Sequence, residues 1–201
     1  MNAPPGARRP LETEIKLPVR NPEELKRRLR ELGFRRVMAR HFERNVLFDF
    51  SDQRLRKAGC LLRLRFAGRR SVLTFKGRSV RSETYKVRRE IETGVEDGLG
   101  VRTILGKLGM REAFGYEKYR TIYAPRRSRE EPEPFHVFYD ETPIGDYLEL
   151  EGTERRIDQV ARQLGYSSEH YITASYAALY WQSCRARGRP PGNMVFRARK
   201  S

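Results

Sequence analysis

Eight segments of the chain alternate charged with apolar residues, and this two-residue period constrains the fold more than any other feature of the sequence. A period of two places successive side chains on opposite faces of a β-strand. The first segment, LETEIKLPV, puts Glu12, Glu14 and Lys16 on one face and Ile15 and Leu17 on the other. The other segments span residues 45–50, 60–66, 72–77, 85–93, 116–123, 135–141 and 146–152. The sequence therefore predicts eight strands, or seven if residues 45–50 are set aside, and most of them have one charged face.

Apolar residues at helical spacing predict four helices between and after these strands, at residues 21–33, 97–109, 154–164 and 174–184, with a helical turn at 51–59. In the first helix Asn21 can cap, Pro22 suits the first turn and Gly33 ends the segment. Many short strands with turn signals between them are typical of an antiparallel sandwich or barrel. We therefore expect an α+β fold in which the helices cover the apolar face of the sheet.

The length of 201 residues favours a single domain, which we expect at residues 11–184. Residues 1–10 are expected to form a flexible arm, residues 124–134 a surface loop and residues 185–201 a basic tail. The two cysteines are far apart, and the three histidines lack metal-ligand spacing. With no apolar run long enough for a membrane span and no secretory signal, the sequence predicts a cytoplasmic protein that does not enter membranes.

The charged faces pool carboxylates with cations, and two interpretations of them differ in what the faces contact. The carboxylates are Glu12, Glu14, Glu90, Glu92, Asp140, Glu149 and Glu151. The cations are Lys16, Arg63, Arg65, Lys76, Lys86, Arg88, Lys118 and Arg120. In an open sheet these faces would meet solvent and form weak cross-strand ion pairs, whereas in a closed barrel they would face inward. Carboxylate pairs in the first, fifth and last strands, with basic pairs in strands between, favour a built site over a solvated face.

Such a site suits phosphate chemistry. Paired carboxylates are hard oxygen ligands for Mg²⁺ or Mn²⁺, which bind proteins through one or two carboxylates and substrate phosphates. Arginine offers a planar fork to phosphate oxygens and lysine a point charge. Phosphoryl transfer chiefly needs positioning of the phosphates and neutralisation of developing charge. A net charge of +16 is also expected to attract phosphate-bearing partners.

An ordered set of motifs resembles the CYTH, or triphosphate tunnel metalloenzyme, superfamily. The motifs are ETEIK, LLRLR, LTFKG, RREIE, EKYR and DETPIGDYLELEG, and SYAALY near Ser175 is similar to the closing segment of the family. The superfamily includes class IV adenylyl cyclases, thiamine triphosphatases and inorganic or RNA triphosphatases. The resemblance implies an eight-stranded antiparallel closed β-barrel whose interior is a hydrophilic tunnel.

The resemblance also implies a role for each matching residue. The implied triphosphate-binding residues are Lys16, Arg63, Arg65, Lys76, Arg88, Lys118 and Arg120. The implied metal-binding positions are Glu12, Glu14, Glu149 and Glu151, supported by Glu92 and Asp140. Lys16, Glu90 and Arg120 are the expected catalytic residues, with Glu90 placing the nucleophile, and Lys86 has no assigned role.

The resemblance implies a Mg²⁺- or Mn²⁺-dependent enzyme whose partner is a small triphosphate such as ATP, thiamine triphosphate or inorganic triphosphate. The first interpretation is an adenylyl cyclase that converts ATP to cyclic AMP and pyrophosphate, or a related triphosphatase. The alternative is a basic nucleic-acid or polyphosphate binding module without catalysis, and weak nucleic-acid binding by the basic surface is compatible with both. We expect a monomer or a homodimer.

Overall fold

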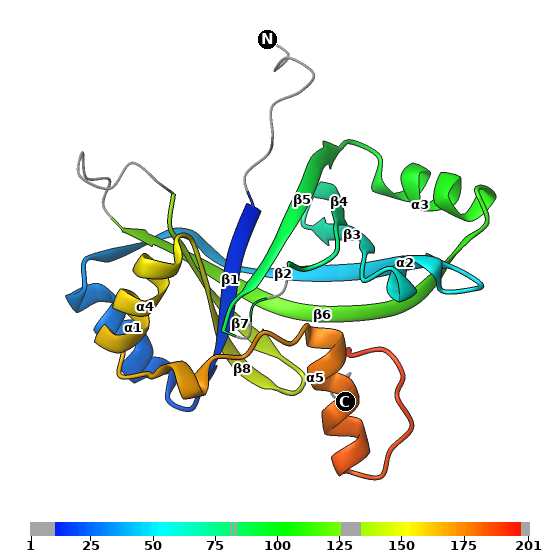
Figure 1. The fold of residues 1–201 in the computed structure, drawn as a ribbon. Coiled ribbons are helices and arrows are strands. Elements are labelled where there is room, and N and C mark those ends of the chain that lie inside the picture. Colours follow the sequence, from blue (N-terminus) through cyan, green and yellow to red (C-terminus); the bar gives the residue numbers. More distant parts are fainter. Residues whose placement is uncertain (1–10, 81, 83, 126–133, 198–201) are drawn as a thin grey trace.

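Eight antiparallel strands close into a barrel, as the resemblance implied (Figure 1). The computed structural model describes residues 11–80, 82, 84–125 and 134–197. The strands are β1 (Leu11–Val19), β2 (Phe34–Phe50), β3 (Leu61–Ala67), β4 (Arg70–Lys76), β5 (Lys86–Val95), β6 (Met110–Pro125), β7 (His136–Thr142) and β8 (Gly145–Glu151). Their order around the barrel is β1-β5-β4-β3-β2-β6-β7-β8, and β8 pairs with β1 to close it.

Helices form where caps and apolar spacing predict them. They are α1 (Pro22–Glu31), α2 (Arg54–Lys57), α3 (Gly98–Lys107), α4 (Glu154–Gln163) and α5 (Tyr176–Ala186), with a 3₁₀ turn η1 at Ser168–His170. The side chains of Asn21, Asp97, Thr153 and Ser175 each accept a hydrogen bond from a backbone N–H in the first turn of their helix. Such caps satisfy donors that have no partner within the helix.

Strand β2 is much longer than the sequence predicted. The expected strand covered residues 45–50, whereas β2 begins at Phe34. Its first half, FRRVMARHFER, shows no apolar alternation because most of its side chains are exposed. Pairing with the equally long β6 holds this half in the sheet, and the register shifts between Arg36 and Met38 and between Met38 and His41 mark irregularities there.

The apolar faces of the strands point outward, and the helices cover them. Leu25 and Leu29 of α1 and Ile157 and Val160 of α4 pack with β1, β7 and β8 in the largest core cluster. Figure 1 shows α1 and α4 together on one side of the barrel, α3 on the far side and α5 against one end. A second cluster joins Leu105 of α3 to β2 and β3, and a third lies beneath α5. The core is therefore a shell around the barrel.

The segment after α5 runs back along the barrel and pairs with β6. Met194 is fully buried and forms a parallel bridge with Tyr116. Its N–H donates to the carbonyl of Gly115, and its carbonyl accepts from the N–H of Glu117. Because β7 pairs with β6 only from Tyr119 onward, this part of β6 has a free edge that the segment covers. The predicted basic tail thus includes residues that pack on the domain.

Some expectations fall on residues that the structure does not describe. The predicted arm at residues 1–10 lies outside the described residues, as do most of the predicted surface loop, at 126–133, and the last four residues. None of the helices formed by the described residues is both long and apolar enough to cross a membrane.

Candidate functional site

The barrel encloses a cavity of about 920 Å³ that is lined by residues from all eight strands and from the start of α5. Of the fourteen predicted site residues, all except Asp140 line this cavity. The charged faces therefore point inward, which decides between the two interpretations of the strand pattern. Ten lysines and arginines and seven glutamates line the cavity, a net charge of +3 out of +16 for the whole chain. Most of the excess positive charge lies outside the barrel.

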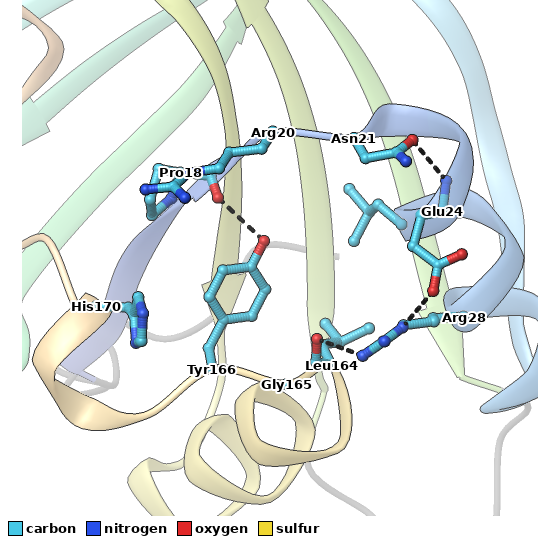
Figure 2. A pocket seen from close by; sticks show the side chains of 10 residues that line it. Pro18, Arg20, Asn21, Glu24, Arg28, Leu164, Gly165, Tyr166 and His170 are labelled. Atoms are coloured by element: carbon cyan, nitrogen blue, oxygen red, sulfur yellow. Dashed lines mark hydrogen bonds and ion pairs between the residues drawn. The ribbon is translucent and has the colours of Figure 1, made fainter.

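A second hollow lies between α1 and the end of α4, and its side chains hold neighbouring elements together (Figure 2). In it the Tyr166 hydroxyl donates to the carbonyl of Pro18, and Arg28 donates both to Glu24 and to the carbonyl of Leu164. The Arg28 hydrogen bond ties α1 to the end of α4, and the Tyr166 hydrogen bond ties the segment after α4 to β1. The barrel cavity, with its many convergent charges, is the candidate functional site.

Strands β1 and β8 place four of the predicted metal-binding carboxylates side by side. Glu14 pairs in register with Glu151, and Lys16 pairs with Glu149. The Nζ atom of Lys16 lies 3.0 Å from Glu149 and 3.6 Å from Glu14, while Lys86 lies 2.7 Å from Glu14. Burial opposes ionisation of Glu14, but Lys16 and Lys86 outweigh it and hold its pKa well below the ordinary value. Lys86, which had no predicted role, is thus part of the site.

Crowding of carboxylates at the start of β1 fits a cation-binding role. Burial raises the pKa of Glu12 to about 9, and the nearby Glu90 and Glu151 add to the shift. Burial together with Glu14 raises the pKa of Glu151 to about 7. Hard oxygen donors that repel one another suit Mg²⁺ or Mn²⁺. Among the residues that the structure describes, no three His, Cys, Asp or Glu side chains are already arranged to hold a metal ion. The donor chemistry therefore fits a metal, and its remaining ligands would come from substrate and water.

Asp140 lies behind the cavity wall, where protein donors surround it. Its carboxylate accepts from Lys118 at 2.9 Å, twice from Arg120 at 2.7 Å, and from the hydroxyl of Tyr176 at 2.7 Å. The Asp140 side chain has no exposed surface. Asp140 therefore orients Lys118 and Arg120 toward the cavity, and Arg120 also contacts Glu149.

Across the barrel, Glu92 and Glu90 hold the cations of β3 and β4. Glu92 accepts from the hydroxyl of Thr74 at 3.1 Å and lies 3.7 Å from Arg63 and 3.5 Å from Arg65. Glu90 contacts Lys76 and lies 3.6 Å from Arg63. Glu92 and Glu90 thus lie beside cations of the neighbouring strands β3 and β4.

Arg88 differs from the other buried cations of the cavity. It is 8% exposed, and its Nε atom has no hydrogen-bond partner. Among the ion pairs of the described residues, none joins Arg88 to a carboxylate within 4 Å. Burial lowers the pKa of its guanidinium. A buried arginine without a close counter-ion is costly unless an anion binds it.

Sequence reasoning missed Glu43, His41 and Tyr176 as parts of the site. Glu43 is buried and lies 3.6 Å from Lys118 and 3.9 Å from Arg65. The Nε2 atom of His41 lies 3.3 Å from Glu43, and its Nδ1 lies 3.0 Å from the carbonyl of Ala39. Glu43 and His41 lie in the first half of β2, where no apolar alternation marks a strand. The ring of Tyr176 lies under Lys16 and Lys118, 5.2 Å from each Nζ, which no local pattern could show.

Several proteins with known structures share this barrel. A structure from Vibrio parahaemolyticus, described as a "putative adenylate cyclase", superposes with a TM-score of 0.71 at 18% identity, covering 83% of this chain and 95% of the other. The PH1819 protein of Pyrococcus horikoshii gives 0.70 at 22% identity, covering 86% and 99%. The Hippeastrum protein HpAC1, described as having a dominant triphosphatase activity, gives 0.58 at 19% identity, covering 90% and 97%.

Sequence comparison agrees with the structural one. A Methanocaldococcus jannaschii protein named "Putative adenylate cyclase MJ0240" is 28% identical over 173 residues, covering 84% of this chain and 98% of that protein. The model of the CYTH domain family matches residues 10–176, which include every predicted site residue. The chain therefore belongs to the CYTH domain family.

Proposed function

We propose that this protein is a divalent-metal-dependent enzyme that acts on a triphosphate inside the barrel, either as an adenylyl cyclase or as a closely related triphosphatase. The single observation that carries the proposal is Arg88, a buried cation with no close carboxylate, in a cavity lined by paired cations and glutamates. The Vibrio, Methanocaldococcus and Hippeastrum proteins named above all carry the printed description "putative" adenylate or adenylyl cyclase, and the Hippeastrum protein is also described as having a dominant triphosphatase activity, which supports both variants of the reaction.

The cations of the cavity would bind the phosphate chain. Arg88 would meet the phosphate oxygens first because it gives up no ion pair on binding. Each of the other phosphate-binding cations lies beside a carboxylate. On binding it must either leave that carboxylate for a phosphate oxygen or contact both. This set comprises Lys16, Arg63, Arg65, Lys76, Lys118 and Arg120. Lys16 and Arg120, held by Glu149, would neutralise charge that develops during reaction.

The carboxylates of β1 and β8 would hold the metal. Glu12, Glu14, Glu149 and Glu151 are contiguous on these two strands. Bound there, a divalent ion supplies charge neutralisation and orientation of the phosphate oxygens. Asp140, which lies behind the cavity wall, and Glu92, which lies beside Arg65 of β3, would support the metal site through the cations that they hold.

Glu90 would place the attacking group. Its position opposite Lys76 and beside Glu12 gives it a pKa below the ordinary value, because the hydrogen bond from Glu12 and the Lys76 ammonium outweigh burial. An ionised carboxylate can accept a hydrogen bond from an O–H group and orient its oxygen. In a cyclase that group is the ribose 3′-hydroxyl aimed at the α-phosphate, and in a triphosphatase it is water aimed at the terminal phosphate.

Product analysis tests this proposal. The purified protein is incubated with Mg²⁺ or Mn²⁺ and with ATP, thiamine triphosphate or inorganic triphosphate. Cyclic AMP with pyrophosphate identifies a cyclase, and orthophosphate identifies a hydrolase. Glu14→Gln is expected to abolish turnover with the fold intact by circular dichroism, whereas Glu96→Gln, an exposed substitution on the same scaffold, is expected to retain it. Unaltered turnover in Glu14→Gln would refute the metal assignment. Triphosphate binding with no product would instead favour a non-catalytic binding module.

A further inference from the structure

A third hollow of about 530 Å³ lies between α5, the turn from β7 to β8 and the segment that follows α5. Figure 1 shows this last segment leaving α5, turning and running back beside it. The hollow is lined by Tyr180, Ser183 and Cys184 of α5 and by Asn193 and Phe196 of the returning segment, together with three arginines, Arg187, Arg189 and Arg197. The family model ends at residue 176, so this chain builds the hollow mostly from residues beyond the shared domain.

The charge of the hollow is of one sign. No aspartate or glutamate is among its lining residues. Within the described part of the chain, Arg187, Arg189 and Arg197 form no ion pair with a carboxylate. This contrasts with the barrel, where almost every cation has a carboxylate beside it. Three guanidinium groups without ion pairs among the described residues, set around one concave surface, offer hydrogen-bond donors that bind phosphate oxygens well.

The frame that holds the three arginines is ordered. Met194 is fully buried against β6, and the side-chain oxygen of Asn193 accepts from the N–H of Gly115 at 2.8 Å. The N–H of Phe196 donates to Glu117 at 3.1 Å, and the N–H of Arg189 donates to the carbonyl of Cys184 at 2.9 Å. The arginines therefore extend from a fixed backbone.

We propose that this hollow is a second binding site, outside the barrel, for the phosphate groups of nucleotides, either free or within a single-stranded nucleic acid. Tyr180 and Phe196 add aromatic surface to the arginines, and aromatic rings with arginines recur where single strands bind. The excess of positive charge outside the barrel attracts such ligands from a distance. The site stands independently of catalysis inside the barrel.

Two triple variants of equal net charge test the site. Arg187→Gln, Arg189→Gln and Arg197→Gln remove the arginines of the hollow. Arg30→Gln, Arg35→Gln and Arg155→Gln remove three exposed arginines elsewhere and serve as the matched control. Fluorescence anisotropy measures binding of a labelled single strand of about 12 nucleotides, and calorimetry measures binding of AMP, which has no triphosphate. Amide exchange at Glu117 confirms in each variant that the segment remains docked.

The site variant is expected to bind the single strand about tenfold more weakly than the wild type, with the slope of log K against log salt reduced by about 2 for three lost phosphate contacts. The control is expected to lose much less. A parallel loss for AMP identifies a free-nucleotide site, and an effect on the strand alone identifies a nucleic-acid site. Equal losses in both triple variants, an unchanged site variant, or a wild type that binds neither probe would each overturn the proposal.

Discussion

Arg120 donates a hydrogen bond of 2.7 Å to each carboxylate oxygen of Asp140, across the paired strands β6 and β7. Both side chains are buried, and the pair fixes the guanidinium that contacts Glu149 at the cavity wall. A paired buried carboxylate of this kind acts on the site by positioning the cations around it.

Loss of the Asp140 charge is expected to destabilise the protein. Asp140→Asn leaves the buried Lys118 and Arg120 without their shared counter-ion, which costs about 3–5 kcal/mol. Glu141→Gln breaks the exposed pair with Arg40 and is expected to cost about 1 kcal/mol or less. Urea unfolding measures both. Equal free energies of unfolding for the two variants would show that Asp140 does not anchor the cations.

Removal of Arg88 is expected to weaken ligand binding and spare the fold. Hydrogen bonds to charged groups contribute about 1.5–3 kcal/mol, so Arg88→Gln should raise the Kd for inorganic triphosphate about ten- to a hundredfold. The free energy of unfolding should not fall, because no close ion pair is broken. Arg89→Gln, the next residue on β5 but exposed, is the matched control. Calorimetry that found the same Kd in both variants would remove Arg88 from the site.

The pKa values of His41 on β2 and His136 on β7 are expected to be shifted in opposite directions. The hydrogen bond to Glu43 raises the pKa of His41 above the ordinary value of 6.5, whereas burial lowers that of His136. The His41 pair therefore stabilises the fold fully below pH 6.5, and this stabilisation is lost as the pH rises through the raised pKa. NMR titration should show a higher pKa for His41 than for His136. Glu43→Gln should lower the pKa of His41 and leave that of His136 unchanged. If the pKa of His41 does not change in Glu43→Gln, the pairing of His41 with Glu43 is contradicted.

Truncation of Met194 is expected to release the segment after α5. Met194→Ala removes a fully buried side chain, which costs about 2–5 kcal/mol if the whole domain responds. The amide of Glu117, which donates to the Met194 carbonyl, should then exchange faster. Val195→Ala, at a side chain that is 46% exposed, should leave exchange unchanged. If both variants exchange like the wild type, the segment is held by other contacts.

Much of the barrel could be predicted from the sequence because strand alternation is local. The faces of Arg63 and Arg65 and of Glu149 and Glu151 follow from a period of two, and each points into the cavity as predicted. The first half of β2 could not be predicted, since its exposed side chains carry no apolar pattern and only pairing with β6 makes it a strand. Glu43 was missed for that reason.

By itself, the sequence of this protein determined which residues share a strand face, where helices are capped, and the family to which its motifs are similar. The strand pattern left open whether the charged faces point inward, and the closed barrel decided it. Only the tertiary structure showed that Arg120, Lys118 and Tyr176 all donate hydrogen bonds to Asp140 and that Met194 packs on β6. The physical reason is the separation along the chain of the residues that determine each feature. Side-chain direction along a strand is set by neighbouring residues, whereas barrel closure and burial depend on pairings between residues that are far apart in the chain.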